Sequence, residues 1–438
     1  MQEVYQQAPV RTTAPQGGQR WIVVGCAFLV AAVSYLDRNN ISIAAGPLQR
    51  QFLLSNVQLG AVFSAFVLGY AFSQPLAGRV ADRIGASRAI AIAIIWWSVF
   101  TALLPFVPAT LSYSIGLLMA VRFLLGVGES IIFPASNRLI ASWIPLQERG
   151  LANGIIFSGV GVGGSAAPPL ITAIMVRYQW HWAFWLCALI GLLAGALWIA
   201  LVRDTPAEQN RVGGAELHYI QAGLPIASSS LRLTAVHWRV ILSDRHVLML
   251  TVSYFCYGYV AYIFFTWLFK YLSDVRGLSL RSSAIYTMLP FIAMAVASSL
   301  GGWVSDRLLV PFGKRVARCG IAALSLLIAG IFVWLATQVH DTRVAALVLA
   351  GGAGALYFAQ SAYWAMSADM GGASAGAVSG VMNMGCQLGG AVTASLTPVV
   401  ATQLGWTASF ALAAGICMVG AIAWTFIDPF HTVTDRSV

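Results

Sequence analysis

Long runs of hydrophobic residues, separated by short polar segments, dominate the sequence. The segments Trp21–Tyr35, Ala89–Val107 and Val316–Thr337 consist almost entirely of apolar residues. Each approaches or exceeds the ~20 residues that a helix needs to cross the hydrocarbon core of a bilayer. Backbone polar groups in lipid must bond within their own segment, so these runs favour transmembrane helices.

Twelve such runs occur, and we therefore predict an all-α membrane protein with twelve transmembrane helices embedded in a lipid bilayer. The predicted spans are residues 21–44, 57–77, 88–107, 111–135, 149–175, 182–202, 247–271, 282–303, 316–337, 343–367, 375–402 and 406–427. Composition supports this prediction, because 59% of the 438 residues are hydrophobic and only 9% are charged. Ordinary soluble domains have about 25% charged residues.

Two stretches of sequence recur at an almost constant offset. One follows the second span and recurs 224 residues later, with Gly78, Asp82 and Arg83 matching Gly302, Asp306 and Arg307. The other lies in span five and recurs 226 residues later in span eleven, with Gly154, Gly159, Gly163 and Gly164 matching Gly380, Gly385, Gly389 and Gly390. Chance is a poor explanation for so many matches in register. Spans one to six and seven to twelve are therefore predicted to be parallel repeats.

The repeat predicts the domain organisation. We expect a disordered cytoplasmic tail (1–20), an N-terminal six-helix bundle (21–202), a cytoplasmic linker (203–245), a C-terminal six-helix bundle (246–427) and a second tail (428–438). Two six-helix halves related in this way form the major facilitator architecture, whose substrate site lies between the halves near the membrane midplane.

Lys and Arg are unevenly distributed between the two sides of the predicted membrane. With the N-terminus inside, the inside segments carry 17 of these residues and the outside segments 6. Both termini are therefore predicted to be cytoplasmic. The net charge of +10 is therefore explained by the Lys and Arg residues that set the orientation in the membrane. A nucleic-acid partner is not expected, because these residues do not cluster on one soluble face. The histidines lack metal-ligand spacing, so no metal or cofactor is expected.

Two acids and two arginines lie well inside the predicted spans: Asp37 and Arg38 in span one, and Arg122 and Glu129 in span four. Such a group costs ~2.5–3.5 kcal/mol unless it is paired or hydrated, which makes it a candidate functional residue. A buried carboxyl group beside an arginine can exchange a proton near physiological pH. An arginine keeps its charge and suits an anionic substrate. A static ion pair, Asp37 with Arg122 or Glu129 with Arg38, is the alternative.

The segment from Gly78 to Arg88 reads G-x-x-x-D-R-x-G-x-x-R and resembles the signature loop of the major facilitator superfamily. The resemblance implies a latch on the cytoplasmic side, with Asp82 near the N-terminal end of span eleven, where a carboxylate stabilises a helix by ~0.3–1 kcal/mol. The alternative is an arginine-rich topology anchor. The predicted cytoplasmic gate consists of Gly78, Asp82, Arg83, Arg88, Asp306 and Arg307.

The charged spans narrow the resemblance. Tyr35-Leu-Asp37-Arg38-Asn-Asn-Ile-Ser-Ile-Ala44 and Arg122-Phe-Leu-Leu-Gly-Val-Gly-Glu129 are similar to the anion:cation symporter family. That family includes bacterial galactonate, glucarate and hexuronate transporters and, in animals, sialin and the vesicular glutamate transporters. By this resemblance, Asp37 and Glu129 are protonation sites, Arg38 holds the substrate carboxylate and Arg122 partners one of the acids.

The same resemblance implies that neutral polar and aromatic side chains bind the rest of the substrate, although each of them could instead serve only helix packing. These candidates are Tyr35, Tyr70, Gln74, Ser361, Trp364, Asn383 and Gln387. The chain departs from many relatives in two places. Phe157 stands where they carry Asn, and Trp267-Leu-Phe-Lys-Tyr271 replaces Trp-Leu-Pro-Thr-Tyr. Phe157 and a crowd of tyrosines in span seven keep an aromatic acid open as the substrate.

The resulting prediction is a monomeric, proton-coupled symporter that imports a small organic anion, namely a hexonate, hexarate or hexuronate, by alternating access. A bacterial inner membrane is expected, because the outside segment 46–56 is short whereas the animal relatives carry a long glycosylated loop there. A drug:proton exporter is the nearest alternative, although its apolar or cationic cargo has no use for an arginine. An enzyme would need a nucleophile–base set or a metal cluster, and the sequence shows neither. A sensor would need a soluble signalling domain, and the linker is too short to form one.

Overall fold

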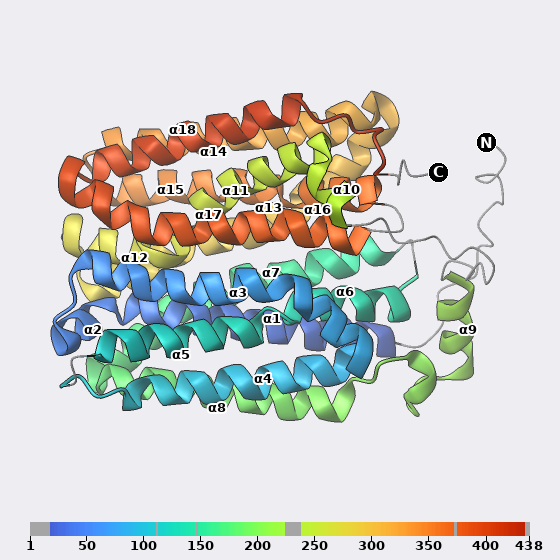
Figure 1. Ribbon diagram of the computed structural model, residues 1–438, viewed down its shortest axis with the longest axis horizontal. Coiled ribbons are helices and arrows are strands. Elements are labelled where there is room, and N and C mark those ends of the chain that lie inside the picture. The colour runs from blue at the N-terminus through green and yellow to red at the C-terminus, as the bar shows by residue number, and fades with distance from the viewer. Residues whose placement is uncertain (1–17, 111–112, 146–147, 224–237, 372–374, 434–438) are drawn as a thin grey trace.

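The computed structural model is an assembly of helices in two stacked bundles (Figure 1). It describes residues 18–110, 113–145, 148–223, 238–371 and 375–433, and no strand occurs in these ranges. The predicted all-α class is confirmed. Residues 1–17 of the predicted N-terminal tail, 224–237 of the linker and 434–438 of the C-terminal tail lie outside the described residues.

Within the described residues, the first bundle contains eight α-helical segments and the second bundle contains another eight. The first comprises α1 (Gln19–Ile43), α2 (Ala45–Phe52), α3 (Asn56–Ile84), α4 (Ala86–Leu103), α5 (Ser114–Glu129), α6 (Ile132–Trp143), α7 (Arg149–Arg177) and α8 (Trp180–Leu201). The second comprises α11 (Arg245–Thr266), α12 (Leu268–Lys270), α13 (Leu280–Lys314), α14 (Ile321–Gln338), α15 (Thr342–Phe358), α16 (Gln360–Gly371), α17 (Ala375–Leu404) and α18 (Trp406–Thr425). Helices α9 (Gly214–Gly223) and α10 (Trp238–Ser243) lie between the bundles in the sequence.

Short 3₁₀ turns occur at Leu104–Phe106 and Pro206–Glu208, and π-helical turns at Tyr271–Val275 and Arg315–Gly320. Within the described residues, 11 helical segments are long and apolar enough to cross a membrane. Helix α17 completes the predicted twelve. Its 30 residues rise about 45 Å, although Asn383, Gln387 and several glycines make it more polar than the other spans.

Helix breaks occur inside predicted spans four, seven and ten and at the end of span one. Helix α1 is separated from α2 at Ala44, α5 from α6 at Ser130, α11 from α12 at Trp267, and α15 from α16 at Ala359. These are spans one, four, seven and ten, so the interruptions follow the internal repeat. Side chains can satisfy the backbone groups that a broken helix frees. At the break between α5 and α6, Nε2 of Gln74 donates a hydrogen bond to the Ser130 carbonyl at 3.3 Å.

The recurring glycines bring equivalent helices together in the two halves. On α7, Gly159 and Gly163 lie against the backbone carbonyls of Phe28 and Ala32 of α1. On α17, the matching Gly385 and Gly389 lie against the carbonyls of Thr251 and Phe255 of α11. A Cβ atom at any of these positions would collide with the neighbouring backbone, which explains why small residues recur there.

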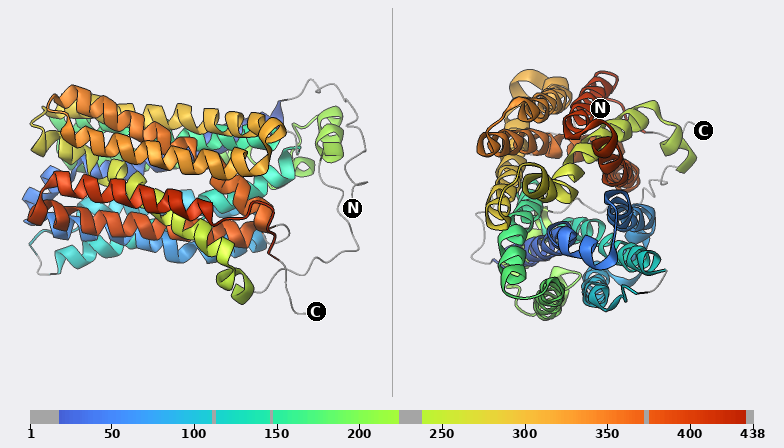
Figure 2. Two further views of the ribbon diagram at one scale, coloured as in Figure 1. Left: turned by 90° about the horizontal axis from the view of Figure 1, so that it is seen from above. Right: turned by 90° about the vertical axis from the view of Figure 1, so that its left-hand side faces the viewer.

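The two bundles meet along α3 beside α17 and along α7 beside α13, and the start of α1 and the end of α18 lie at one end of the molecule (Figures 1 and 2). Away from that end, the halves are tightly joined. Ser64 Oγ of α3 donates to the Ala391 carbonyl of α17 at 2.7 Å, and Phe63 of α3 packs against Trp267 of the second half, with ring centroids 5.4 Å apart. We call this contact the far-end seal; it consists of Gly60, Phe63, Ser64, Trp267, Ala391, Ala394 and Ser395.

Helix α9 is attached to the first bundle at the end where α1 begins. Arg20 at the start of α1 pairs with Glu148 at 2.8 Å and with Glu216 of α9 at 3.2 Å. Tyr219 of α9 donates a hydrogen bond to Glu148 at 3.0 Å. These contacts fix the first part of the linker to the first half.

Candidate functional site

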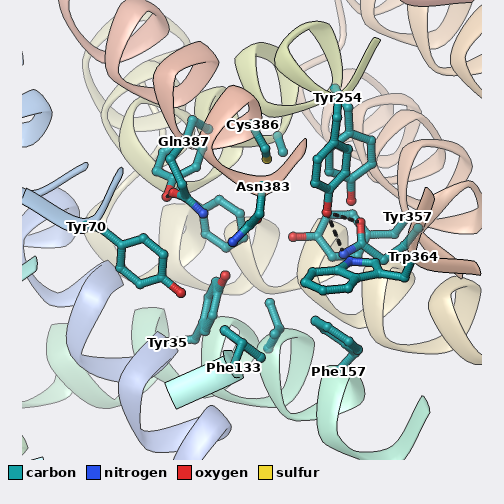
Figure 3. Close-up of a pocket in the computed structure, with 16 residues that line it drawn as sticks. Tyr35, Tyr70, Phe133, Phe157, Tyr254, Tyr357, Trp364, Asn383, Cys386 and Gln387 are labelled. Carbon is teal, nitrogen blue, oxygen red and sulfur yellow. Dashed lines mark hydrogen bonds between the residues drawn. The ribbon is translucent and has the colours of Figure 1, made fainter. Parts of the chain in front are cut away.

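A cavity of about 40 Å³ lies between the two bundles, with room for roughly three water molecules. Figure 3 shows that side chains from both halves converge on it. Ten of its sixteen lining residues are aromatic: Tyr35, Tyr70, Phe133, Phe157, Tyr254, Tyr257, Tyr262, Phe265, Tyr357 and Trp364. Its polar groups are tyrosine hydroxyls and the amides of Gln360, Asn383 and Gln387. The cavity therefore offers flat apolar faces with neutral hydrogen-bonding groups between them.

One aromatic wall of the cavity joins the two halves. Phe157 of α7 stacks on Phe133 of α6, with ring centroids 5.2 Å apart, and packs against Trp364 of α16 at 5.4 Å. On the second half, Tyr254 and Tyr257 of α11 stack at 5.0 Å. Aromatic pairs at these separations stabilise an interface beyond the area that they bury, by about 0.5–1.5 kcal/mol each.

A buried ion pair lies beside the cavity. Nη2 of Arg38 is 2.8 Å from Oε2 of Glu129, and the side chains are 4% and 0% exposed. Three rings surround the guanidinium, with Cζ 4.4 Å from the centroid of Tyr35 and 4.9 Å from those of Phe66 and Tyr70. The ring faces contribute a favourable cation–π interaction to the buried guanidinium. This pair realises one of the two pairings that the sequence left open.

The ion pair continues into a hydrogen-bond chain that crosses between the halves. Nη1 of Arg38 donates to the hydroxyls of Tyr35 at 3.2 Å and Tyr262 at 3.3 Å. The Tyr262 hydroxyl in turn donates to Oε1 of Gln387 at 2.5 Å. Arg38 does not itself line the main cavity, whereas Tyr35, Tyr70 and Tyr262 do. These tyrosines separate the guanidinium from the cavity in this conformation.

Asp37 occupies a separate buried position on the same helix. Its Oδ2 accepts a hydrogen bond of 2.6 Å from Thr101 of α4, and its Oδ1 has no hydrogen-bond partner among the described residues. Arg122 is also buried, with Cζ 4.6 Å from the Phe66 ring. Arg122 and Arg38 both line a second, smaller cavity. Glu129 pairs with Arg38 and not with Arg122 in the part of the chain that the structure describes.

The structure places the seven predicted substrate-binding residues in two groups. Tyr35, Tyr70, Trp364, Asn383 and Gln387 line the cavity. Gln74 does not line it and instead bonds the Ser130 carbonyl, and the half-buried Ser361 faces Gly302 of α13. The roles of all seven in substrate binding stay predictions.

The predicted gate residues lie on α3, α4 and α13, near the end of the molecule where α1 begins and α18 ends. Arg83 and Arg88 are exposed, and Arg307 lies with Cζ 4.8 Å from the Trp303 ring. For Gly78, Asp82 and Asp306 the structure describes only the backbone, which is helical. The turn that joins α3 to α4 needs Gly85, whose φ is +93° and whose Cβ position faces the Asp204 carboxylate.

Several residues that touch the charged groups or the cavity were not singled out as site residues from the sequence, among them Thr101, Tyr262, Gln360 and Phe66. Thr101 was detectable, because it is a polar residue within an otherwise apolar span. Tyr262 was only one of several tyrosines in span seven, and Gln360 only one of several polar residues in span ten. Phe66, which touches both arginines, carries no sequence signal, because an apolar ring is typical of any span.

Three comparisons place these features among known proteins. The model of the Major Facilitator Superfamily matches residues 27–394. The probable sulfoacetate transporter of Cupriavidus necator is 32% identical over 94% of this chain and 95% of its own, and the hexuronate transporter of Bacillus subtilis is 29% identical over 90% and 92%. A solved D-xylose–proton symporter has the same fold, with a TM-score of 0.73 at 16% identity over 94% of this chain and 98% of its own.

Proposed function

Since the chain belongs to the Major Facilitator Superfamily, and its relatives are transporters of the anion:cation symporter type, we propose that it imports a small organic anion together with protons. The chain is a multi-pass membrane transporter and not an enzyme. The observation that supports proton coupling best is the buried Arg38–Glu129 pair beside a cavity between the halves. We propose a bacterial inner membrane as its location, with both termini cytoplasmic.

The coupling we propose is an exchange of carboxylates on Arg38. Without substrate, Glu129 neutralises the guanidinium at 2.8 Å. A proton that binds Glu129 removes this negative charge and leaves a buried cation without its counter-ion. Breaking a buried ion pair in this way costs about 3–5 kcal/mol, and the carboxylate of a substrate restores the balance. Proton and anion therefore favour each other's binding.

Access from the cavity to Arg38 requires only side-chain movements in this proposal. Nη1 of Arg38 contacts the hydroxyls of Tyr35 and Tyr262, which line the cavity. A substrate carboxylate that displaces these hydroxyls reaches the guanidinium. Asp37, held by Thr101 at 2.6 Å, is the proposed second proton site, and Arg122 is the proposed charge partner near the two acids.

For the cargo we propose a sugar acid, meaning a hexonate, hexarate or hexuronate. Support comes from the tyrosine hydroxyls and the amides of Asn383 and Gln387 that line the cavity, since these groups match a polyhydroxylated chain. The relative named as a hexuronate transporter adds support. An aromatic carboxylate is the second candidate, because ten of sixteen lining residues are aromatic. A drug:proton exporter is disfavoured by the buried arginines.

The test is transport by the purified protein in liposomes. A thermal-shift screen of sugar acids, dicarboxylates and aromatic acids at two pH values first selects the cargo. We expect Glu129→Gln to abolish accumulation driven by a pH gradient, while counterflow of labelled cargo survives, because a permanently neutral side chain cannot release its proton.

Asp341→Asn is the matched control, because this exposed acid caps α15 and asparagine keeps that cap. The control should transport like the wild type in both assays. Proton-driven accumulation and counterflow that both remain intact in Glu129→Gln would refute the proposed coupling.

A further inference from the structure

Tyr262 is the residue through which the charged site of the first half contacts the second half. Its hydroxyl lies 3.3 Å from Nη1 of Arg38 on α1 and 2.5 Å from Oε1 of Gln387 on α17. We propose that Tyr262 is a positioning residue that takes the place of the substrate carboxylate on Arg38 and thereby lets the empty carrier change its orientation. This inference rests on the proposed transport of an anion held by Arg38.

The geometry fixes the direction of the Tyr262 hydrogen bonds. A hydroxyl has one proton and two acceptor lone pairs, and an arginine donates only. Because the Tyr262 proton is donated to Gln387, a lone pair of the same oxygen is turned toward Arg38. The ring is 4% exposed and packs against Gly390 of α17 and Phe265 of α11. Tyr262 is therefore held in the orientation that accepts from Arg38.

The surroundings of Arg38 match the needs of an unloaded carrier. A symporter that accumulates its cargo must return empty after each delivery, with its binding site closed between the halves. A buried guanidinium needs both a counter-ion and acceptors for its N–H groups. Glu129 supplies the counter-ion, and Tyr35 and Tyr262 supply acceptors for Nη1. Tyr35 belongs to the same helix as Arg38, so only Tyr262 also joins the two halves.

The partly loaded carrier lacks this arrangement. With a proton on Glu129 and no anion, the Tyr262 hydroxyl is still an acceptor but carries no negative charge. The buried Arg38 then has no counter-ion, so closure of the two halves is disfavoured. With both proton and anion bound, the substrate replaces Tyr262 as the link between the halves. Closure is thus favoured for the empty and the fully loaded carrier.

The experiment separates the empty return from the loaded steps. Net uptake of radiolabelled glucuronate into liposomes requires the empty return, whereas counterflow of glucuronate against glucuronate does not. Labelled 4-hydroxybenzoate replaces glucuronate if the wild type carries only the aromatic acid. We expect Tyr262→Phe to slow net uptake about tenfold, while the counterflow rate stays within twofold and its KM is unchanged.

Tyr259→Phe is the control. Tyr259 lies on the same helix and is buried, but it lines neither of the two cavities, so its loss should leave both rates unchanged. Equal losses of net uptake and counterflow, or a higher counterflow KM, would make Tyr262 a substrate ligand or a purely structural residue. Unchanged net uptake would likewise overturn the inference.

A second variant keeps the test informative if Tyr262→Phe is unstable. Gln387→Met removes the acceptor that orients the Tyr262 hydroxyl. Because Gln387 is also a proposed substrate ligand, counterflow itself can change in this variant, and the expected result is a ratio of net uptake to counterflow about tenfold lower than in the wild type. Failure of the proposed proton coupling would be seen separately, as wild-type uptake that ignores the pH gradient. The split between the two assays can still be measured in that case, because any carrier that releases its cargo must return empty.

Discussion

Phe157 is the cavity residue whose surroundings distinguish best between the two proposed kinds of cargo. Its ring lies parallel to Phe133 at 5.2 Å and contacts Trp364 of the opposite half at 5.4 Å. A planar aromatic acid gains from such a wall, since an aromatic contact contributes about 0.5–1.5 kcal/mol beyond the area that it buries. A sugar acid gains more from an amide at this position.

We therefore expect Phe157→Asn to weaken binding of an aromatic carboxylate about tenfold, which corresponds to ~1.4 kcal/mol, and to leave sugar-acid binding within threefold. The measurement is a thermal shift titrated with glucuronate and with 4-hydroxybenzoate. The control is Gln338→Asn, because Gln338 is an exposed polar residue on α14. A larger loss of binding for glucuronate than for 4-hydroxybenzoate in Phe157→Asn would contradict this role of Phe157.

The sequence predicted the charged residues of the site better than their pairing. Burial costs make any acid or arginine within an apolar run conspicuous, so Asp37, Arg38, Arg122 and Glu129 could be named from the sequence alone. Which arginine meets which acid depends on the rotation of α1 against α5, which single residues do not encode. The contacts of Tyr262 could not be predicted for a related reason, because its partners Arg38 and Gln387 are remote in the sequence.

The start of α11 is an element whose stability should depend on pH. Asp244 accepts hydrogen bonds from the backbone N–H groups of His246 and Val247 at 2.9 and 3.1 Å, and its Oδ2 lies 2.6 Å from Nε2 of His431 in the segment after α18. Burial alone would raise the pKa of Asp244. The bonds from His431 and the backbone outweigh burial and lower this pKa below its ordinary value.

A carboxyl group with a lowered pKa in the folded state stabilises the fold above its unfolded pKa of about 4 and loses that contribution as the pH falls through the folded value. We expect Asp244→Ala to lower stability at pH 7 by about 1 kcal/mol, and the difference from the wild type to shrink below about pH 4. Thermal denaturation of both proteins between neutral and acidic pH provides the measurement. A difference that stays constant over this range would exclude the ionised carboxylate as its cause.

Helix continuity was the element-level property that the sequence predicted least well. An apolar run of sufficient length predicts a span, but it does not show where the hydrogen-bond ladder stops. At the Ala44 break, Gly46 and Pro47 follow within three residues, as is typical of a helix end. The breaks at Ser130, Trp267 and Ala359 have no glycine or proline directly after them. Long-range contacts such as Gln74 with the Ser130 carbonyl stabilise such breaks, and these contacts form only in the folded bundle. Glycine spacing, by contrast, predicted the internal repeat, and the matching glycines of α7 and α17 lie against α1 and α11 in the same way.

At the scale of the whole molecule, the proposed transport cycle requires the far-end seal to open and to close again. Gly60 of α3 leaves no room for a side chain, because its Cβ would lie 2.5 Å from the Ala394 carbonyl and 3.1 Å from Pro398. We expect Gly60→Val to prevent closure at this end. Net uptake and counterflow should both fall more than tenfold, while the thermal shift caused by the cargo persists.

Gly116→Val is the matched control for this substitution. Gly116 lies on α5 of the same half, is exposed, and has no heavy atom within 4 Å of its Cβ position, so transport should be retained. Wild-type counterflow in Gly60→Val would show that the contact between α3 and α17 need not form during transport.

The chemical make-up of the far-end seal also bears on the electrical behaviour of the carrier. Every residue of the seal is uncharged, and its hydrogen bonds between the halves join the Ser64 hydroxyl to the Ala391 carbonyl and to the Ser395 hydroxyl. A charge that crosses the membrane field changes the energy by about 2.3 kcal/mol per 100 mV, but opening this seal moves no formal charge. Membrane voltage should therefore act on the protons, the anion and the Arg38 site they occupy, and leave the closure of this seal unaffected.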